Sequence, residues 1–335
     1  MPKKSEMTAV VFDGDGTGRI VSMPVPALEK GWIIIAPVAS GLCGTDLHIA
    51  TGDFPFGRLP VIPGHEFAGF VSAVGEGVED FAVGDWVGAN PNISCGYCKM
   101  CKIGATNLCD SLAAAGISLN GSMADFVAVP QSVAIKLSPE ISQLQAPLIE
   151  PLSCVLHALE RSGSWESQKM IIFGAGTIGL IAALLAKAEG ASEVVVIDPQ
   201  ELRHELAEEF GATQTAIDLT DLDGQEFDIA LDASGNPGAI ASAISILGKR
   251  GRLIQMGVTN PELTVAFSPY ELYAKELTFI GSNSLAEQYE NASHRMLQLG
   301  PMLEKLITGS YRLSEINQAM AAMRSGEHLK IQIRD

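Results

Sequence analysis

Four cysteines gathered in one short segment are the residues of this chain whose spacing points most directly to chemistry. Cys95, Cys98, Cys101 and Cys109 follow the pattern C-x2-C-x2-C-x7-C. A tetrahedral zinc ion takes four thiolates at about 2.3 Å, and two-residue gaps let one loop surround it. The spacing therefore predicts a structural zinc site that holds a lobe over about residues 90–112.

Two other interpretations of these cysteines stay open. Bacterial iron–sulfur runs share the C-x2-C-x2-C spacing, but their fourth cysteine follows closely and precedes a proline. Here seven residues intervene and Asp110 follows. Disulfides require an oxidising compartment, and residues 1–30 contain no apolar signal segment behind Lys3 and Lys4. Zinc in a cytoplasmic protein is the interpretation that we favour.

The length and composition of the chain limit the functions that it can have. The chain has 335 residues, a length that predicts two domains. Its formal net charge is −17, and no basic run interrupts this balance, which argues against nucleic acid or an anionic membrane as partner. No apolar stretch reaches the roughly 18 residues of a membrane span. These features favour a cytoplasmic enzyme and say little about its substrate.

The organisation of the chain changes near residue 145. Before it, the strand-like runs Gly31–Val38, Gly69–Val74 and Trp86–Ala89 are separated by turn signals, which predicts a compact strand-rich module. After it, apolar strand-like runs alternate with helical stretches: Met170–Phe173, Ile178–Glu189, Glu193–Ile197, Glu201–Phe210, Phe227–Asp232 and Arg252–Gly257. This alternation predicts a parallel sheet with helices on both faces. A last strand-like run, Leu329–Ile333, is expected to return to the first module.

A glycine fingerprint lies where this alternation begins. Gly174, Gly176 and Gly179 form G-x-G-x-x-G between a strand-like run and an apolar helix, with Thr177 and Ile178 before the third glycine. The first glycine permits a tight turn, the second lets a pyrophosphate approach the backbone, and the third lets helix pack on strand. The positive end of the helix dipole favours the phosphates. The pattern predicts dinucleotide binding, the alternative being a glycine-rich turn in a nucleotide-free sheet.

An acidic residue follows the fingerprint at the expected distance. Asp198 ends the next strand-like run, nineteen residues beyond Gly179, where an acid accepts hydrogen bonds from a ribose 2′-hydroxyl. A 2′-phosphate would be repelled there, so we expect NAD to be preferred over NADP. Arg203 could approach the adenine side and weakens that preference.

A third set of residues offers mixed metal ligands. These are Cys43 in the run Cys43-Gly-Thr-Asp-Leu-His48, then His65 and Glu66, and later Glu150. Three protein ligands plus water are the open arrangement of catalytic zinc. Each residue also has a plain structural interpretation: Cys43 as a small buried apolar side chain, His65 as a core imidazole, and either glutamate as a solvated charge or helix cap.

Taken in order, these motifs resemble the zinc-dependent medium-chain dehydrogenases over essentially the whole chain. The branch most resembled is that of sorbitol and other polyol dehydrogenases and of threonine dehydrogenase, because Glu66 directly follows His65 and Glu150 lies in Leu148-Ile-Glu-Pro-Leu-Ser153. Simple alcohol dehydrogenases carry a second cysteine ligand near that place. Cys154 lies close by and is interpreted as core packing, since Glu150 occupies the matching position.

The resemblance implies an α/β architecture of two domains. A GroES-like distorted β-barrel catalytic domain is formed by residues 1–145 and 285–335, and a Rossmann NAD-binding domain by residues 146–284. On the nicotinamide side the resemblance implies contacts from Ser234, Met256, Gly257, Val258, Ser282 and Asn283. It also implies a homotetramer or homodimer that pairs edge strands near Leu277–Ile280.

The resemblance also implies a reaction. Cys43, His65 and Glu66 bind catalytic zinc, with Glu150 at or just beyond the metal. The zinc lowers the pKa of a substrate hydroxyl, and hydride passes to the nicotinamide. Thr45 relays the proton through the cofactor ribose to His48, whose alternative interpretation is a plain surface imidazole. Two zinc ions per chain, one catalytic and one structural, are therefore expected together with NAD.

The substrate is expected to be a polyol or similar sugar alcohol, oxidised at a secondary hydroxyl to a ketone. Ser284 and Leu285 stand where sorbitol dehydrogenases carry an Arg-Tyr pair, and Ile49 stands where they often carry tyrosine. The alternatives are therefore threonine or a butanediol-like vicinal diol, a sugar phosphate and a cyclitol. A more distant alternative is a non-catalytic relative that kept only the fold.

Overall fold

The computed structural model describes residues 5–222 and 224–334, which form two compact units. The terminal unit combines the chain up to Ser153 with the segment from Ala286 onward, and the central unit contains Cys154–Leu285. The sequence placed these limits at residues 145 and 284. The first boundary falls inside helix α3 (Ile149–Ser162), which belongs partly to each unit. None of the helices in the described ranges has the length and apolar composition needed to cross a membrane.

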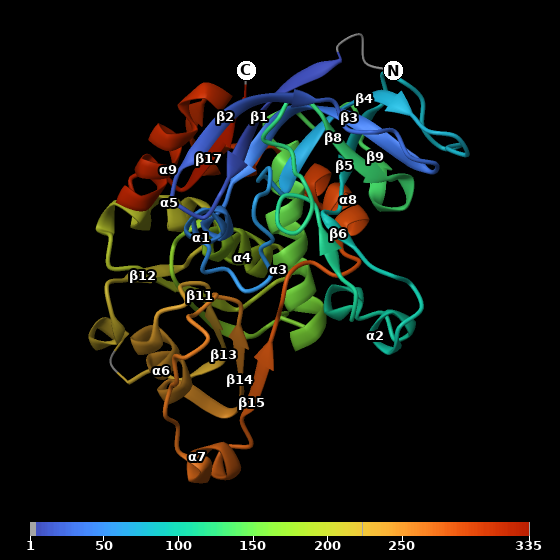
Figure 1. Ribbon diagram of the computed structural model, residues 1–335. Helices are drawn as coiled ribbons and strands as arrows, with labels where there is room; N and C mark the ends of the chain where they lie inside the picture. Colours follow the sequence, from blue (N-terminus) through green and yellow to red (C-terminus); the bar gives the residue numbers. More distant parts are fainter. Residues whose placement is uncertain (1–4, 223, 335) are drawn as a thin grey trace. The chain divides into compact units, whose positions relative to one another are not determined.

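The terminal unit is built on a seven-stranded sheet in the order β16-β17-β3-β4-β5-β9, with β8 beside β3. β17 comes from the end of the chain and runs antiparallel to β3, with Ile331 opposite Leu42, so the two chain ends share one sheet (Figure 1). Two small antiparallel pairs, β1-β2 and β6-β7, complete its strands. The strand bounds are β1 Glu6–Phe12, β2 Gly18–Pro24, β3 Trp32–Leu42, β4 Glu66–Val74, β5 Trp86–Ala89, β6 Asn92–Ile93, β7 Ala113–Ala114, β8 Val127–Pro130, β9 Ala134–Lys136, β16 Ile307–Tyr311 and β17 Lys330–Ile333.

Short helices connect these strands. α1 (Gly44–Thr51) begins directly after β3 and ends at Gly52, whose φ of 77° is the left-handed conformation that favours glycine. Its apolar side, including Ile49, packs into a core with Leu42 and with Ile316 of α9. The helices of this unit besides α1 and α3 are α2 Lys99–Lys102, α8 Tyr289–Leu299 and α9 Ile316–Ser325.

The central unit contains six parallel strands in the order β12-β11-β10-β13-β14-β15. The strand sequence reverses direction between β10 and β13, which is the switch point of a Rossmann sheet. The bounds are β10 Lys169–Phe173, β11 Glu193–Ile197, β12 Gln214–Ala216, β13 Phe227–Asp232, β14 Leu247–Gln255, β15 Thr278–Gly281, α4 Thr177–Ala188, α5 His204–Glu209, α6 Pro237–Ser245 and α7 Pro269–Ala274. The predicted α/β class is confirmed.

The strongest sequence signals in this unit correspond to the best-buried elements. Residues 170–173 of β10 and 194–197 of β11 are all buried, as expected of strands covered on both faces. The helix predicted over Glu201–Phe210 is shorter than expected, because Glu201–Arg203 forms a 3-10 turn and only His204–Glu209 is α-helical. β14 begins at Leu247, ahead of the predicted start at Arg252.

Candidate metal and cofactor sites

The mixed ligand set forms where two neighbouring strands meet. β3 and β4 are antiparallel with Gly41 opposite Glu66, so the residues just beyond the end of β3 lie beside the start of β4. One ligand atom from each of Cys43, His65 and Glu66 lies within 4.8 Å of the others. His65 and Glu66 are buried and Cys43 is half-buried. A sulfur, a nitrogen and an oxygen donor converging this closely fit a zinc ion with an open coordination position.

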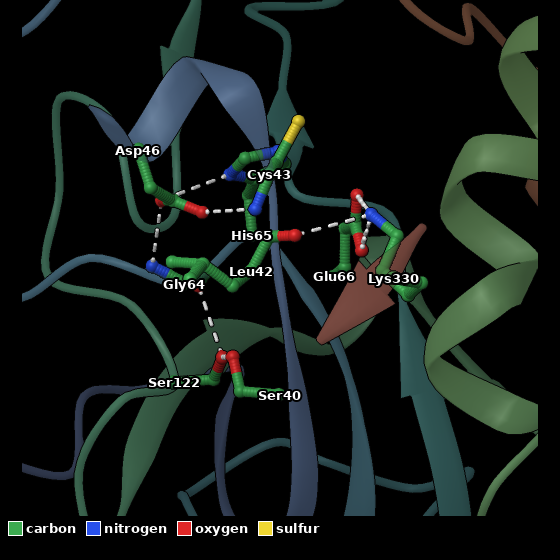
Figure 2. Close-up of polar contacts among 9 residues, drawn as sticks. All are labelled: Ser40, Leu42, Cys43, Asp46, Gly64, His65, Glu66, Ser122 and Lys330. Atoms are coloured by element: carbon green, nitrogen blue, oxygen red, sulfur yellow. Dashed lines mark hydrogen bonds and ion pairs between the residues drawn. The ribbon is translucent and has the colours of Figure 1, made fainter. Parts of the chain in front are cut away.

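Asp46 holds this ligand set together from the first turn of α1. Its Oδ2 accepts the backbone N–H of Cys43 at 2.8 Å, and its Oδ1 accepts the N–H of Gly64 at 3.4 Å (Figure 2). Oδ1 also lies 3.5 Å from Nδ1 of His65, which is long for a hydrogen bond and acts as an ionic contact. Asp46 is fully buried. A carboxylate behind a histidine ligand is a common way to orient the imidazole.

The neighbours of His65 oppose the effect of burial on the pKa of its imidazole. Burial alone would lower the pKa of His65, but Asp46 and Cys43 outweigh it and raise the pKa well above the ordinary value in the metal-free chain. Sequence reasoning placed Asp46 in the motif without giving it a role. The signal was its position three residues after Cys43, where an acid can accept the backbone N–H at the start of a helix.

Lys330 is a second residue that the sequence did not reveal. Its ammonium donates to both carboxylate oxygens of Glu66, at 2.7 and 2.8 Å, and to the carbonyl of Leu42 at 3.3 Å (Figure 2). The two side chains are 4% and 1% exposed. Burial would lower the pKa of Lys330, but the charges of Glu66, Cys43 and Glu150 raise it above its usual range. Gly41 allows this packing, because a Cβ there would overlap the Glu66 carboxylate.

The other predicted catalytic residues lie near this set or on its rim. Glu150 is buried in the first turn of α3 but is not part of the group of mutually close ligand atoms found in the described residues. Thr45 is half-buried in α1, one residue before Asp46. His48 is exposed, and its Nδ1 lies 3.1 Å from Oδ1 of Asp53. The structure thus brings together the three residues predicted to be direct ligands and places His48 at the surface.

The four-cysteine lobe has the geometry of a closed metal site. The Sγ atoms of Cys98 and Cys101 are 3.5 Å apart, those of Cys95 and Cys101 are 3.9 Å apart, and those of Cys98 and Cys109 are 3.9 Å apart. A tetrahedron with bonds of about 2.3 Å has edges of about 3.8 Å, so these spacings suit zinc. They are far too long for disulfides, so the four cysteines of the lobe are free thiols.

Backbone N–H groups prepare the lobe for thiolates. Those of Cys98 and Cys101 approach the sulfurs of Cys95 and Cys98, and that of Ser111 approaches the sulfur of Cys109. Donors from the backbone of Cys101 and Asp110 lower the pKa of Cys98 to about 6. A thiol that ionises easily is a better metal ligand than an ordinary cysteine.

The glycine fingerprint forms the turn between β10 and α4 in the central unit. Gly174 has a φ of 106°, and a Cβ on Gly179 would overlap the carbonyl of Gly174, so both positions require glycine. No heavy atom lies within 4 Å of the Cβ position of Gly176, which leaves the turn open where a phosphate would approach. Thr177 and Ile178 begin α4 and are half-buried.

Asp198 lies against this turn. Its Oδ2 accepts the N–H of Ala175 at 2.8 Å and its Oδ1 accepts the N–H of Gln200 at 2.9 Å. Arg203 forms an ion pair with it at 3.4 Å. Asp198 is 4% exposed, and its Oδ1 retains a lone pair beyond the bond to Gln200, whereas Oδ2 accepts from both Ala175 and Arg203. The acid and the arginine that the sequence assigned to the cofactor are therefore partners of each other.

The remaining predicted cofactor residues follow the carboxyl ends of neighbouring strands. Ser234 comes after β13, residues 256–258 come after β14, and Ser282 and Asn283 come after β15. The N–H of Ser282 donates to the carbonyl of Gln255 at 3.0 Å, which ties the last two segments together. Ligands of open parallel sheets bind at this edge.

Two of the residues that separate the chain from sorbitol dehydrogenases are packing residues here. Ile49 is 1% exposed in the core of the terminal unit and Leu285 is 0% exposed. Ser284 adopts a positive φ of 57°. The apolar character of Ile49 and Leu285 thus reflects core packing and carries no information about the polarity of a substrate pocket.

Comparison with known proteins agrees with these sites. Residues 29–139 match the alcohol dehydrogenase GroES-like domain and residues 177–298 match the zinc-binding dehydrogenase domain. The D-altritol 5-dehydrogenase of Agrobacterium fabrum is 34% identical over 92% of this chain and 94% of its own. The L-threonine 3-dehydrogenase of Colwellia psychrerythraea is 32% identical over 91% and 93%. A zinc-binding dehydrogenase of Sinorhizobium meliloti, crystallised with NADP, superposes with a TM-score of 0.93 at 28% identity over 99% and 100%.

Proposed function

Because the chain belongs to the zinc-binding dehydrogenases with an alcohol dehydrogenase GroES-like domain, and so is an enzyme acting on CH–OH donors, we propose that its substrate is a polyol. A secondary hydroxyl is oxidised to a ketone while the nicotinamide cofactor is reduced. The observation that carries this proposal is the convergence of Cys43, His65 and Glu66. Its similarity to an altritol dehydrogenase along nearly the whole chain supports the substrate class.

In this proposal Cys43, His65 and Glu66 hold the catalytic zinc, Glu150 acts beside it, and the four cysteines of the lobe hold the structural zinc. Zinc supplies a Lewis acid that lowers the pKa of the bound hydroxyl. Asp46 keeps Cys43 and His65 in place. Thr45 would accept the hydroxyl proton while passing its own to the cofactor ribose, and the ribose would pass one to His48. His48, exposed and beside Asp53, would release it to solvent.

The proposed cofactor is NAD, bound at Gly174, Gly176 and Gly179 with the adenosine ribose at Asp198. Replacing Asp198 with Ala should raise the Kd for NAD by more than the Kd for NADP, because a carboxylate attracts a 2′-hydroxyl and repels a 2′-phosphate. Fluorescence titration with NADH and NADPH measures both constants. Equal losses for the two cofactors in Asp198→Ala would contradict the ribose assignment.

A second candidate reaction is oxidation of the hydroxyl of threonine. The support for it is the 32% identity to an L-threonine 3-dehydrogenase over nearly the whole chain. Both reactions use the same zinc ligands and the same cofactor, so they differ only in what holds the remainder of the substrate.

Two further features belong to this proposal. The enzyme is a homo-oligomer, because β15 ends the central sheet and its residues are largely exposed. It works in the cytoplasm, where reducing conditions keep the cysteine lobe ready for zinc.

The test is NADH formation by the zinc-loaded protein with polyols, cyclitols, sugar phosphates, vicinal diols and threonine. The proposal expects turnover of at least one polyol, and its loss in Cys43→Ala. Cys154→Ala is the matched control, since Cys154 is not in either candidate metal group and should retain activity. Turnover of threonine alone would move the substrate class to the second candidate. No turnover with any of these compounds would contradict the proposal.

A further inference from the structure

Asp232, the last residue of β13, is a fully buried carboxylate with no role in the proposed reaction. Its Oδ1 accepts the N–H of Ser234 at 3.1 Å and the hydroxyl of Ser234 at 2.6 Å. Its Oδ2 accepts the N–H of Gly235 at 3.0 Å and the side-chain amide of Gln255 at 2.6 Å. All four donors are neutral groups, and hydrogen bonds to a charged acceptor are stronger than those between neutral partners.

The main chain of Asp232 joins the same network. Its carbonyl accepts the N–H of Met256 at 3.0 Å and the N–H of Gly257 at 2.9 Å. The amide of Gln255 that donates to the carboxylate also donates to the carbonyl of Gly257 at 2.8 Å. One residue at the end of β13 therefore holds both the loop after its own strand, residues 233–236, and the loop after β14, residues 256–258.

These two loops touch each other closely. A Cβ on Gly235 would overlap the carbonyl of Val258, and a Cβ on Gly257 would overlap the backbone nitrogen of Gly235. The loops can therefore approach only as backbone against backbone. Their relative position is fixed by the hydrogen bonds to Asp232, since neither contacting residue has a side chain to lock it.

The network lies beside the glycine turn. Asp232 is paired with Phe173, the residue before Gly174, and the N–H of Ala233 donates to the carbonyl of Phe173 at 2.9 Å. A Cβ on Gly174 would lie 3.4 Å from the Cβ of Ser234. β10 and β13 are the strands between which the sheet order reverses, where dinucleotides bind.

We propose that Asp232 is a positioning residue for the nicotinamide half of the cofactor site. It sets the loops that carry Ser234 and residues 256–258, while the glycine turn and Asp198 hold the adenosine half through separate contacts. This inference rests on the proposed function for the place of the cofactor. Its measurements are binding constants, so it can fail or stand independently of any polyol being oxidised.

The test is Asp232→Asn in the full-length, zinc-loaded protein. Asparagine keeps the shape but turns one acceptor into a donor facing the N–H of Gly235 and the amide of Gln255. NADH affinity, measured by fluorescence titration, should fall by about 10-fold, the effect of losing a charged hydrogen bond. ADP-ribose, which lacks the nicotinamide, should keep its affinity within about 2-fold by calorimetry. Equal losses for both ligands, or no loss for NADH, would overturn the inference.

A matched control and a milder variant keep the test decisive. Asp228→Asn changes an exposed acid of the same strand, whose Oδ2 accepts the N–H of Lys169 at 2.8 Å, and should leave both affinities unchanged. Gln255→Met removes the amide between Asp232 and Gly257 without placing a donor against the carboxylate. If Asp232→Asn does not fold, Gln255→Met should still lower the affinity for NADH and keep the affinity for ADP-ribose within about 2-fold. A wild-type protein that binds ADP-ribose and NADH equally would also overturn the inference.

Discussion

The residues around the mixed ligand set form a buried arrangement of opposing charges. Lys330 lies 264 residues from Glu66 in sequence, yet its ammonium contacts both oxygens of the carboxylate. Cys43 and Glu150 act on the same ammonium through their charges. In the metal-free chain Lys330 is therefore the cation that compensates Glu66, and a zinc ion would share that carboxylate with it. Removing one charge of such a pair leaves the other buried without a partner.

Lys330→Met is expected to lower the free energy of unfolding of the zinc-free protein by about 3–5 kcal/mol. The loss should be smaller in the zinc-loaded protein, because the metal then neutralises Glu66. Urea unfolding of both forms measures the difference. Lys136→Met is the matched control: its ion pair with Asp85 is at the surface, 56% and 25% exposed, and should contribute only about 0–1 kcal/mol. Similar losses in the two variants would contradict a special role for Lys330.

Asp46→Asn is expected to weaken the catalytic site while sparing the structural one. Asparagine can still accept one N–H, but it removes the charge beside His65 and puts a donor where an acceptor was needed. Zinc affinity at Cys43, His65 and Glu66 should fall by about 10–100-fold. Competition with a chelator measures it, and the cysteine lobe of the same protein is the internal reference. Parallel loss of both zinc ions would point to general unfolding instead.

At the scale of elements, the sequence predicted the features that depend on residues close together in the chain. The burial of β10 and β11 follows from their continuous apolar runs, and the turn after β10 follows from Gly174 and Gly179, where the backbone requires glycine. The pairing of β3 with β4 could not be read from the sequence, although it brings Cys43, His65 and Glu66 together by placing Gly41 opposite Glu66. Strand register depends on partners distant in sequence, so a single run of residues does not reveal it.

The lobe of four cysteines is an element whose fold should depend on its metal. Beyond the two-residue strand β6 at its start, it contains the four-residue helix α2 and one short 3-10 turn, with little apolar core of its own. Cys98→Ser should therefore release about one of two zinc ions and lower the melting temperature, since binding energy at such a site is folding energy. Metal analysis and calorimetry measure both. Cys154→Ser, outside the lobe, should retain both ions, and an unchanged melting temperature in Cys98→Ser would count against a folding role.

At the scale of the whole molecule, one chain end completes the sheet begun by the other. β17 pairs with β3, and through this pairing Lys330 reaches Leu42 and Glu66. The strand-like run near the chain end was visible in the sequence. The role of its first residue was not, because a lysine at the start of a strand is normally exposed and nothing nearby in sequence marks it as buried. The sequence motifs therefore predicted the candidate ligands, and the structure revealed Asp46 and Lys330, which contact them.

The outer strand of the central sheet is where we expect a second copy of the chain to bind. Within residues 5–222 and 224–334, β15 pairs with β14 alone, and Phe279 on it packs edge to face with Phe267 at 5.4 Å between ring centroids. On α7, Tyr270 and Tyr273 are 75% and 80% exposed. An unpaired strand edge bordered by exposed aromatic side chains is a surface that a second copy would cover.

Phe279→Asp should therefore weaken self-association by at least about 10-fold, because a charge would be buried at the centre of the shared edge. Light scattering coupled to gel filtration over a dilution series measures the mass. Phe56→Asp is the matched control, since Phe56 is 72% exposed and belongs to the terminal unit, and should leave the mass unchanged. A wild-type monomer would contradict the homo-oligomer, and an oligomer that survives Phe279→Asp would place its interface elsewhere.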